Sequence, residues 1–164
     1  MVRQLDKGLG RLAMKIRGLK QLDVSHIPGA GAAGGIAGAF LGLLGASLRP
    51  GSELIFNLLK IDQLLPQVDL VITGEGRIDF QTPSGKGPGS LAKMARKLGI
   101  PVIAIAGSVS NDRGVLHRHG FSALFSITPG PMDLTTAKRQ SASLLQETAE
   151  QVARLIQATR RHNP

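Results

Sequence analysis

Cysteine is absent from this sequence of 164 residues, and so are tryptophan and tyrosine. Without cysteine, the chain can form no disulfide, no zinc–thiolate site and no cysteine nucleophile. Five phenylalanines are its only aromatic residues, which argues against recognition of single-stranded nucleic acid by base stacking. A chain without cysteine suits a reducing compartment, and we expect a cytoplasmic protein.

Acidic residues are scarce compared with basic ones. Lys and Arg number 20 against 11 Asp and Glu, which gives a formal net charge of +9. The basic residues are spread over several predicted helices, at 3–20, 93–97 and 154–161. Because a nucleic-acid interface concentrates its charge on one face, this spread favours a solvated surface, and we expect no nucleic-acid partner.

One uncharged run, Ile27–Leu48, is long enough to cross a bilayer. Seven of its 22 positions are glycine, and its bulky apolar residues gather in the second half. We therefore expect a glycine loop that leads into a buried helix, and no membrane span. The first residues also lack the apolar core of a signal peptide.

Hydrophobic periodicity divides the chain into a helical first part and an alternating second part. In the first part we expect a helix, an extended segment, the glycine loop and two helices at 4–20, 23–27, 29–35, 36–44 and 50–60. In the second part we expect buried strands at 69–73, 101–106 and 121–127, and helices at 87–98, 111–119 and 134–161. Strands that alternate with helices predict βαβ crossovers and a parallel sheet. The boundary between the two parts is expected near residues 62–68.

A glycine run in the first part matches the spacing G-x-G-x-x-G through Gly29, Gly31, Gly34 and Gly35. Glycines at this spacing allow backbone amides to approach an anion at a helix N-terminus. A dinucleotide site is not expected, because the next acidic residue, Glu53, falls inside a predicted helix. The simpler alternative is a turn with close helix packing, and we favour an anion-binding or cleft-lining loop.

The most informative segment follows the first predicted strand. Ligands of parallel sheets bind at the carboxyl ends of strands, and this end is dense in glycines and polar groups. Carboxylates hold hard cations such as Mg²⁺, and an arginine grips a carboxylate or phosphate in a forked pair. The alternative is a surface loop with an internal ion pair of Arg77 with Asp79 or Glu75. The candidate residues are Thr73, Gly74, Glu75, Gly76, Arg77, Asp79, Gln81 and Thr82.

Two further candidates lie beside this segment. Lys86 follows Ser84-Gly85 and precedes a predicted helix, where the helix dipole disfavours a cation unless an anion is present. It is a candidate phosphate contact, with a solvated lysine as the alternative, and the surrounding residues do not form a Walker A loop. Ser108 follows the second predicted strand and could reach the same site or only help to cap the next helix.

Two motifs together resemble the bacterial glycerate kinase family. They are Pro28-Gly-Ala-Gly-Ala-Ala-Gly-Gly35 and Asp69-Leu-Val-Ile-Thr-Gly-Glu-Gly-Arg-Ile-Asp-Phe-Gln-Thr82, and Pro101-Val-Ile-Ala-Ile-Ala-Gly-Ser108 is similar to that family's next strand. The resemblance implies a Mg²⁺- and ATP-dependent kinase that phosphorylates D-glycerate, commonly to 2-phosphoglycerate. It also implies two α/β domains around a cleft, one of them Rossmann- or flavodoxin-like.

Members of that family are more than twice as long, so the resemblance covers their C-terminal portion. Residues 1–66 would then end an inserted second domain, a helical and glycine-rich remnant. Residues 67–164 would return to the Rossmann-like domain as a βαβαβ sheet. The chain alone would lack part of the active site, and its exposed strand edges invite another chain to complete the sheet.

The resemblance also suggests roles for the candidate residues. Glu75 and Asp79 would bind Mg²⁺ or orient the substrate hydroxyl, and Arg77 would hold the glycerate carboxylate or a phosphate. Lys86 and the amides of 29–35 would hold anionic oxygens. Which carboxylate acts as the base stays open. The alternative function is a non-catalytic nucleotide- or sugar-acid-binding α/β module.

Overall fold

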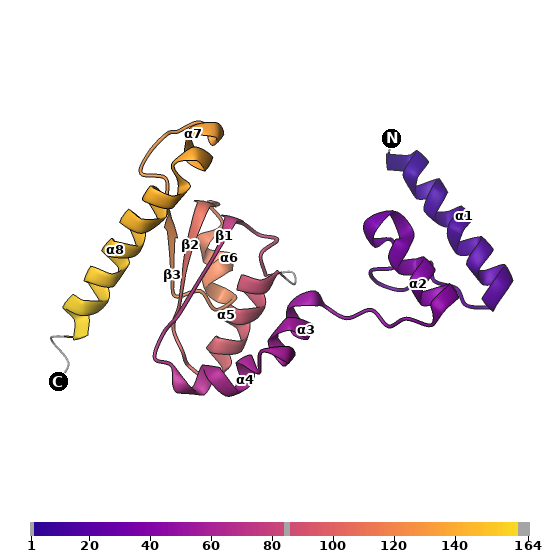
Figure 1. Ribbon diagram of the computed structural model, residues 1–164, viewed down its shortest axis with the longest axis horizontal. Helices are drawn as coiled ribbons and strands as arrows, with labels where there is room; N and C mark the ends of the chain where they lie inside the picture. Colours follow the sequence, from indigo (N-terminus) through magenta and orange to yellow (C-terminus); the bar gives the residue numbers. More distant parts are fainter. Residues whose placement is uncertain (1, 84–85, 161–164) are drawn as a thin grey trace. The chain divides into compact units, whose positions relative to one another are not determined.

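A computed structural model describes residues 2–83 and 86–160 of the chain (Figure 1). By their internal contacts the residues form two compact units, Met1–Pro50 and Gly51–Pro164. Among the described residues, no helix is both long and apolar enough to span a membrane.

The first unit is helical. It contains α1 (Val2–Lys20), the short 3₁₀ helix η1 (Ala32–Gly35) and α2 (Ile36–Leu44). Its small core consists of Ile16, Val24 and Ala30 with partly buried apolar neighbours. The predicted helices at 4–20 and 36–44 are confirmed, whereas the extended segment expected at 23–27 consists of turns and irregular backbone.

Burial of α2 differs from the prediction. Only two of its residues are buried within the unit, Gly38 and Gly42, while Ile36 and Leu44 are 56% and 70% exposed. A Cβ at position 42 would overlap the side chain of Ile16. The glycines thus let α2 approach its neighbours closely, while Leu41 packs against the small core and Ile36 and Leu44 stay exposed.

The second unit is an α/β unit built on a three-stranded parallel sheet with the order β1-β2-β3. This confirms the α/β class and the parallel βαβαβ sheet. Its elements are α3 (Gly51–Leu58), α4 (Ile61–Leu64), η2 (Leu65–Gln67), β1 (Val71–Ile78), α5 (Gly87–Lys97), β2 (Val102–Val109), α6 (Arg113–Arg118), β3 (Ala123–Ser126), α7 (Leu134–Arg139) and α8 (Ser141–Arg160).

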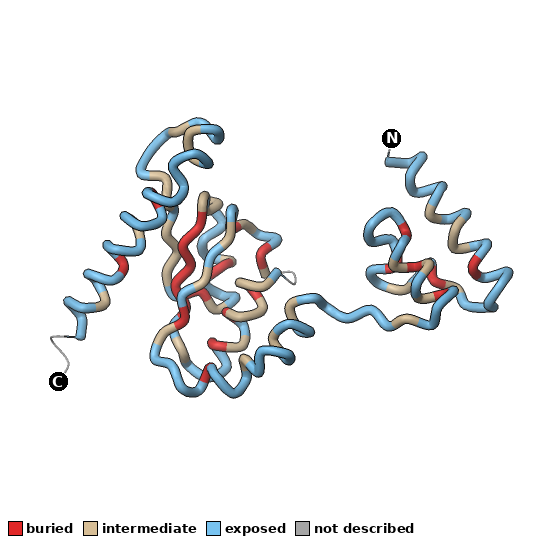
Figure 2. The backbone as a smooth tube through the Cα atoms, in the orientation of Figure 1, coloured by how far each residue is buried: buried red, intermediate tan, exposed pale blue. Residues whose placement is uncertain are grey.

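Helices cover both faces of this sheet (Figure 1). On one face, Ala104 and Ala106 of β2 pack with Ala92 of α5 and Leu116 of α6 in the main core. On the other, Ile103 and Ile105 pack against Val152 of α8. The central strand β2 is the most continuously buried strand (Figure 2). Its near-continuous apolar run is what a parallel strand covered on both faces requires.

The first two strands extend further than predicted. Pairing of β1 with β2 continues beyond Gly74, through Glu75 opposite Ala106 and Arg77 opposite Ser108. Most of the polar segment therefore belongs to a strand, which corrects the predicted end at residue 73. The reason lies in the neighbouring strand, because a Cβ at Gly74 would overlap the carbonyl of Ile105. A glycine that resembles a strand terminator is here a requirement of close strand pairing.

Two helix predictions need correction. The single helix expected at 134–161 is divided into α7 and α8, with Gln140 between them in a non-helical conformation, and residue 161 lies outside the described range. The helix expected at 111–119 is shorter, and Asp112 occupies its N-cap position. The compact units divide at residue 50, whereas the domain assignment 1–66 and 67–164 concerns the longer protein and stays a prediction.

We predict that Gly89→Ala lowers the free energy of unfolding by about 1–3 kcal/mol. The added methyl group in α5 would overlap the backbone carbonyl of Thr82, so the helix or the loop has to move. Gly87→Ala is the matched control, because a Cβ there meets nothing within 4 Å, and its effect should stay below about 0.5 kcal/mol. Urea unfolding followed by circular dichroism measures both variants, and equal stabilities would contradict this packing of α5.

Candidate functional site

Three charged candidates alternate along the end of β1 and the residue that follows it. Glu75 and Arg77 are in the strand, and Asp79 comes directly after it. Side chains two positions apart on a strand share one face. Glu75 pairs in register with Ala106, which packs against α5. Glu75 therefore starts from the face of the sheet that α5 covers. The alternation breaks before Arg77, because the next residue, Ile78, is fully buried in the same core as Ala106, whereas Arg77 is exposed.

A buried hydroxyl links the two carboxylate residues. Thr82 is fully buried, and its Oγ1 donates a hydrogen bond to Glu75 Oε1 at 2.5 Å. The same oxygen accepts a hydrogen bond from the Asp79 backbone N–H at 3.1 Å, while the Thr82 N–H donates to the Asp79 carbonyl at 3.0 Å. The loop after β1 is thus closed on itself, and it ties the Glu75 carboxylate to the Asp79 backbone.

Each carboxylate also has a cation beside it. Lys86 Nζ lies 3.7 Å from Glu75 Oε2, and Arg77 Nε lies 3.4 Å from Asp79 Oδ2. The carboxylate side chains are only 17% and 15% exposed, whereas those of Lys86 and Arg77 are 45% and 70% exposed. The site therefore presents its positive groups to solvent and keeps its negative groups behind them, an arrangement that favours an anionic ligand.

These contacts answer two questions that the sequence left open. The internal Arg77–Asp79 pair, the alternative interpretation of this segment, is present. Lys86 is the N-cap residue of α5, and the Glu75 carboxylate supplies the negative charge that compensates for a cation at that position. Neither pair excludes a ligand, since both cations are partly exposed. Ser84 and Gly85, which precede Lys86, lie outside the described residues.

The remaining candidates of this segment have backbone or lining roles. Gln81 donates its backbone N–H to Asp79 Oδ1 at 3.0 Å, which fixes the turn, and its side chain is exposed. Thr73 and Ser108 line a neighbouring cavity together with Gly74 and Gly76. Ser108 belongs to β2, opposite Arg77, and does not cap the next helix.

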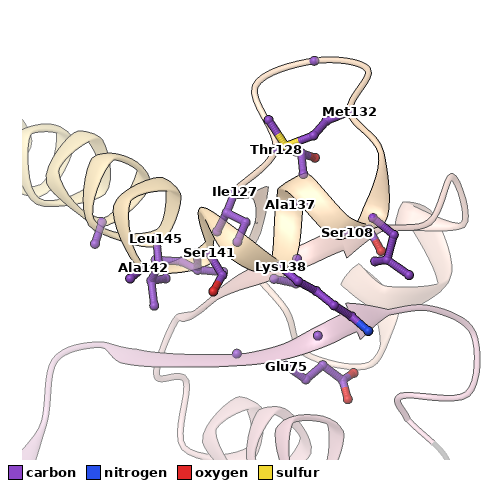
Figure 3. A pocket seen from close by; sticks show the side chains of 18 of the residues that line it. Glu75, Ser108, Ile127, Thr128, Met132, Ala137, Lys138, Ser141, Ala142 and Leu145 are labelled. Carbon is purple, nitrogen blue, oxygen red and sulfur yellow. The ribbon is translucent and has the colours of Figure 1, made fainter.

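That cavity has a volume of about 1090 Å³ and lies between the sheet and the helices α7 and α8 (Figure 3). Its sheet side includes all three strands or the residues directly after them, and its helix side includes Lys138, Ser141 and Leu145. Reasoning from the sequence missed these helix residues. A basic residue in an amphipathic helix is an ordinary surface feature, and no sequence signal shows that α7 turns back over the strand ends.

The glycine run lies in the first unit. Gly29, Gly34 and Gly35 have positive φ values of 89°, 69° and 93°, conformations that favour glycine. A Cβ at Gly35 would also come within 2.7 Å of Leu9 Cδ2, whereas Gly31 has ordinary space. Turn geometry and packing therefore explain much of the run. That its amides join the polar segment in one anion site stays a prediction.

The predicted metal site has two candidate ligands, the carboxylates of Glu75 and Asp79. Within residues 2–83 and 86–160, no group of three His, Asp or Glu side chains is placed to hold a metal ion. Glu75 and Asp79 nevertheless fit the usual requirement of Mg²⁺, which is held by one or two carboxylates and otherwise by phosphate oxygens and water. Their assignment as metal ligands remains a prediction.

We predict that Thr82→Val lowers the free energy of unfolding by about 1–3 kcal/mol, because Glu75 and the Asp79 amide lose a buried partner. The control is Thr148→Val. The half-buried Thr148 hydroxyl donates only to the Leu144 carbonyl of its own helix, so its loss should change the free energy by about 0.5 kcal/mol or less. Chemical denaturation of both variants tests the link, and an equal effect would contradict it.

Comparison with known proteins supplies the family. The family model described as the glycerate kinase family matches residues 1–157. A glycerate kinase of Halalkalibacterium halodurans is 43% identical over 152 residues, which cover 93% of this chain and 40% of that protein. The glycerate 2-kinase of Escherichia coli K12 is 45% identical over 127 residues, 77% of this chain and 33% of that protein.

A solved structure is similar along almost the whole chain. This crystal structure, from Salmonella typhimurium LT2 and named as a glycerate kinase 2, has a TM-score of 0.70 and 38% sequence identity. The match covers 98% of this chain and 41% of the solved one. The chain thus spans well under half the length of the proteins it resembles. It belongs to the glycerate kinase family.

Proposed function

We propose that this chain is part of an ATP-dependent kinase that phosphorylates D-glycerate, giving 2-phosphoglycerate. One observation carries the proposal. The charged segment that the resemblance associates with the active site forms a closed cluster at the end of β1, in which Arg77 and Lys86 are exposed and Glu75 and Asp79 are held behind them. Both substrates of such a kinase are anions, and the cluster presents its cations outward.

In this proposal Arg77 binds the glycerate carboxylate. Its side chain is 70% exposed, and its ion pair with Asp79 is made through Nε. The two terminal nitrogens can therefore grip a carboxylate in a forked pair. Lys86 lies at the start of α5. Its ammonium group binds phosphate oxygens as a compact point charge.

The carboxylates position the attacking group. Phosphoryl transfer depends mainly on in-line placement and charge neutralisation. Either Glu75 or Asp79 accepts the proton of the glycerate hydroxyl. Thr82 holds the Glu75 carboxylate in place, and the Gln81 N–H holds that of Asp79. Mg²⁺, when bound by these carboxylates and the phosphates, supplies the positive charge that neutralises the transferring group.

The strand edges suggest that another polypeptide segment completes the sheet. β1 and β3 are its outer strands, so among the described residues each has one edge without a neighbouring strand. The longer relatives contain more chain than this one, and an uncovered parallel edge is unfavourable. Full activity is therefore expected only when this chain is joined to the portion that the relatives add.

A non-catalytic nucleotide- or sugar-acid-binding module is the second candidate. It is favoured by the short length of the chain relative to the kinases it matches. Both functions predict ligand binding, but only the kinase releases ADP when glycerate is added. A coupled ADP-release assay with D-glycerate, run on this chain and on this chain joined to the remaining portion of the Escherichia coli relative, separates them.

In the joined protein, Arg77→Ala and Asp79→Ala should each lower kcat/KM by at least about 100-fold, or roughly 2.7 kcal/mol. For Arg77→Ala the loss should include a higher KM for glycerate, because the carboxylate grip is removed. Steady-state kinetics with varied glycerate measures both. Arg154→Ala is the control, since Arg154 pairs with Glu150 on the surface of α8 and touches no part of the cluster.

Arg77→Lys extends this test. A lysine keeps the charge and loses the fork, so most of the KM effect should remain. If both alanine variants keep near-normal kinetics, with kcat/KM equal to that of the Arg154→Ala control, the assignment of these residues is removed.

A further inference from the structure

The large cavity above the sheet is a site to which the proposed function has so far assigned no ligand. It lies on the α7–α8 side of the strand ends, with Ile105 and Ile127 on the sheet side and Leu145 on the helix side. The Glu75–Thr82–Lys86 cluster starts from the opposite, α5-covered face. Glu75 and Gly76 border both regions, because the end of β1 separates them.

Charge in this cavity is unbalanced in favour of an anion. Lys138 lines it, and Figure 3 shows its side chain extending from α7 across the opening toward the end of β1. Within the described part of the chain Lys138 has no ion-pair partner. The cavity's one carboxylate, that of Glu75, is already engaged by Thr82 and Lys86.

Gly76 lies at the end of β1, where a ligand in the cavity would cross the strand. Gly76 has no positive φ, and a Cβ built there meets nothing within 4 Å. Neither backbone conformation nor packing among the described residues therefore requires glycine at this position. Gly74 and Gly107 differ, since each avoids a carbonyl of the neighbouring strand. A ligand that lies directly on the end of β1 would explain the missing side chain at position 76.

The helix that carries Lys138 is held in place. Asp133 caps α7 by accepting a hydrogen bond from the Thr136 N–H at 3.0 Å. Hydrogen bonds from the Thr136 side chain and backbone lower the pKa of Asp133. Lys138 lies in the last turn of this helix, where the dipole alone would stabilise a cation. The dipole does not explain why the Lys138 side chain points into the cavity.

From these features we propose that the cavity binds the nucleotide. The adenine and ribose occupy the apolar part between β2, β3 and α8, and Lys138 binds the phosphates as they cross the end of β1 at Gly76. The volume of about 1090 Å³ lies just above the usual range of about 300–1,000 Å³ for small-molecule and cofactor sites. This inference rests on the proposed function, because it takes the phosphate donor of that reaction as the ligand.

The test is calorimetric titration of this chain with ADP, adenosine and pyrophosphate, without glycerate. Lys138→Gln should weaken ADP and pyrophosphate binding about tenfold and leave adenosine binding unchanged, because one charge-assisted contact is lost. Arg139→Gln is the matched control, since Arg139 ends the same helix without lining the cavity. It should bind all three ligands like the unaltered chain.

Two further variants probe the apolar part and the strand end. Leu145→Ala should weaken adenosine and ADP alike, whereas Leu155→Ala, on the same helix and outside the cavity lining, should weaken neither. Gly76→Ala should weaken ADP more than adenosine. Circular dichroism of each variant confirms that it is folded.

The inference is overturned if the unaltered chain binds no ADP up to about 1 mM, or if Lys138→Gln and Arg139→Gln bind ADP equally. A dimer that Leu145→Ala dissociates would also overturn it, because a second copy would then cover the cavity. These readouts are independent of catalysis. ADP binding of the expected kind without glycerate phosphorylation by the joined protein would remove only the proposed function. Phosphorylation with no effect of Lys138→Gln would remove only the nucleotide site.

Discussion

Close parallel pairing of β1 with β2 is the constraint on which the described site depends. The pairing continues past the apolar part of each strand because two glycines remove the Cβ atoms that would meet a neighbouring carbonyl. Gly74 makes room for Ile105, and Gly107 for the carbonyl of Gly76. The sheet thereby carries Glu75 and Arg77 as strand residues, with the small positional freedom of a paired backbone rather than that of a loop.

The loop after β1 brings the charged residues of the strand and of the loop together in one cluster. Thr82, buried and bonded to both Glu75 and the Asp79 backbone, ties the loop to the strand. Gly89 then lets α5 pack directly on the Thr82 carbonyl, which brings Lys86 beside Glu75. Backbone fit and charge placement are therefore parts of one arrangement.

Much of this could be predicted from sequence. Alternating apolar runs and helical periods predicted the parallel α/β unit, and the density of Glu75, Arg77 and Asp79 near a strand end predicted a charged site there. Strand ends were predicted less well, because glycine is a turn signal in sequence and a packing device in this sheet. The break between α7 and α8 was missed for a related reason, since apolar and polar residues keep a helical period on both sides of Gln140.

The sequence by itself determined the class of fold, the family resemblance and the identity of the charged residues, since these depend on local pattern and residue type. Only the tertiary structure decided which charges pair, how far the strands run and where Lys138 points. Those properties depend on contacts between segments far apart in the chain, such as Lys86 with Glu75 across the loop and α7 above the strand ends. Periodicity along one segment carries no information about such distances.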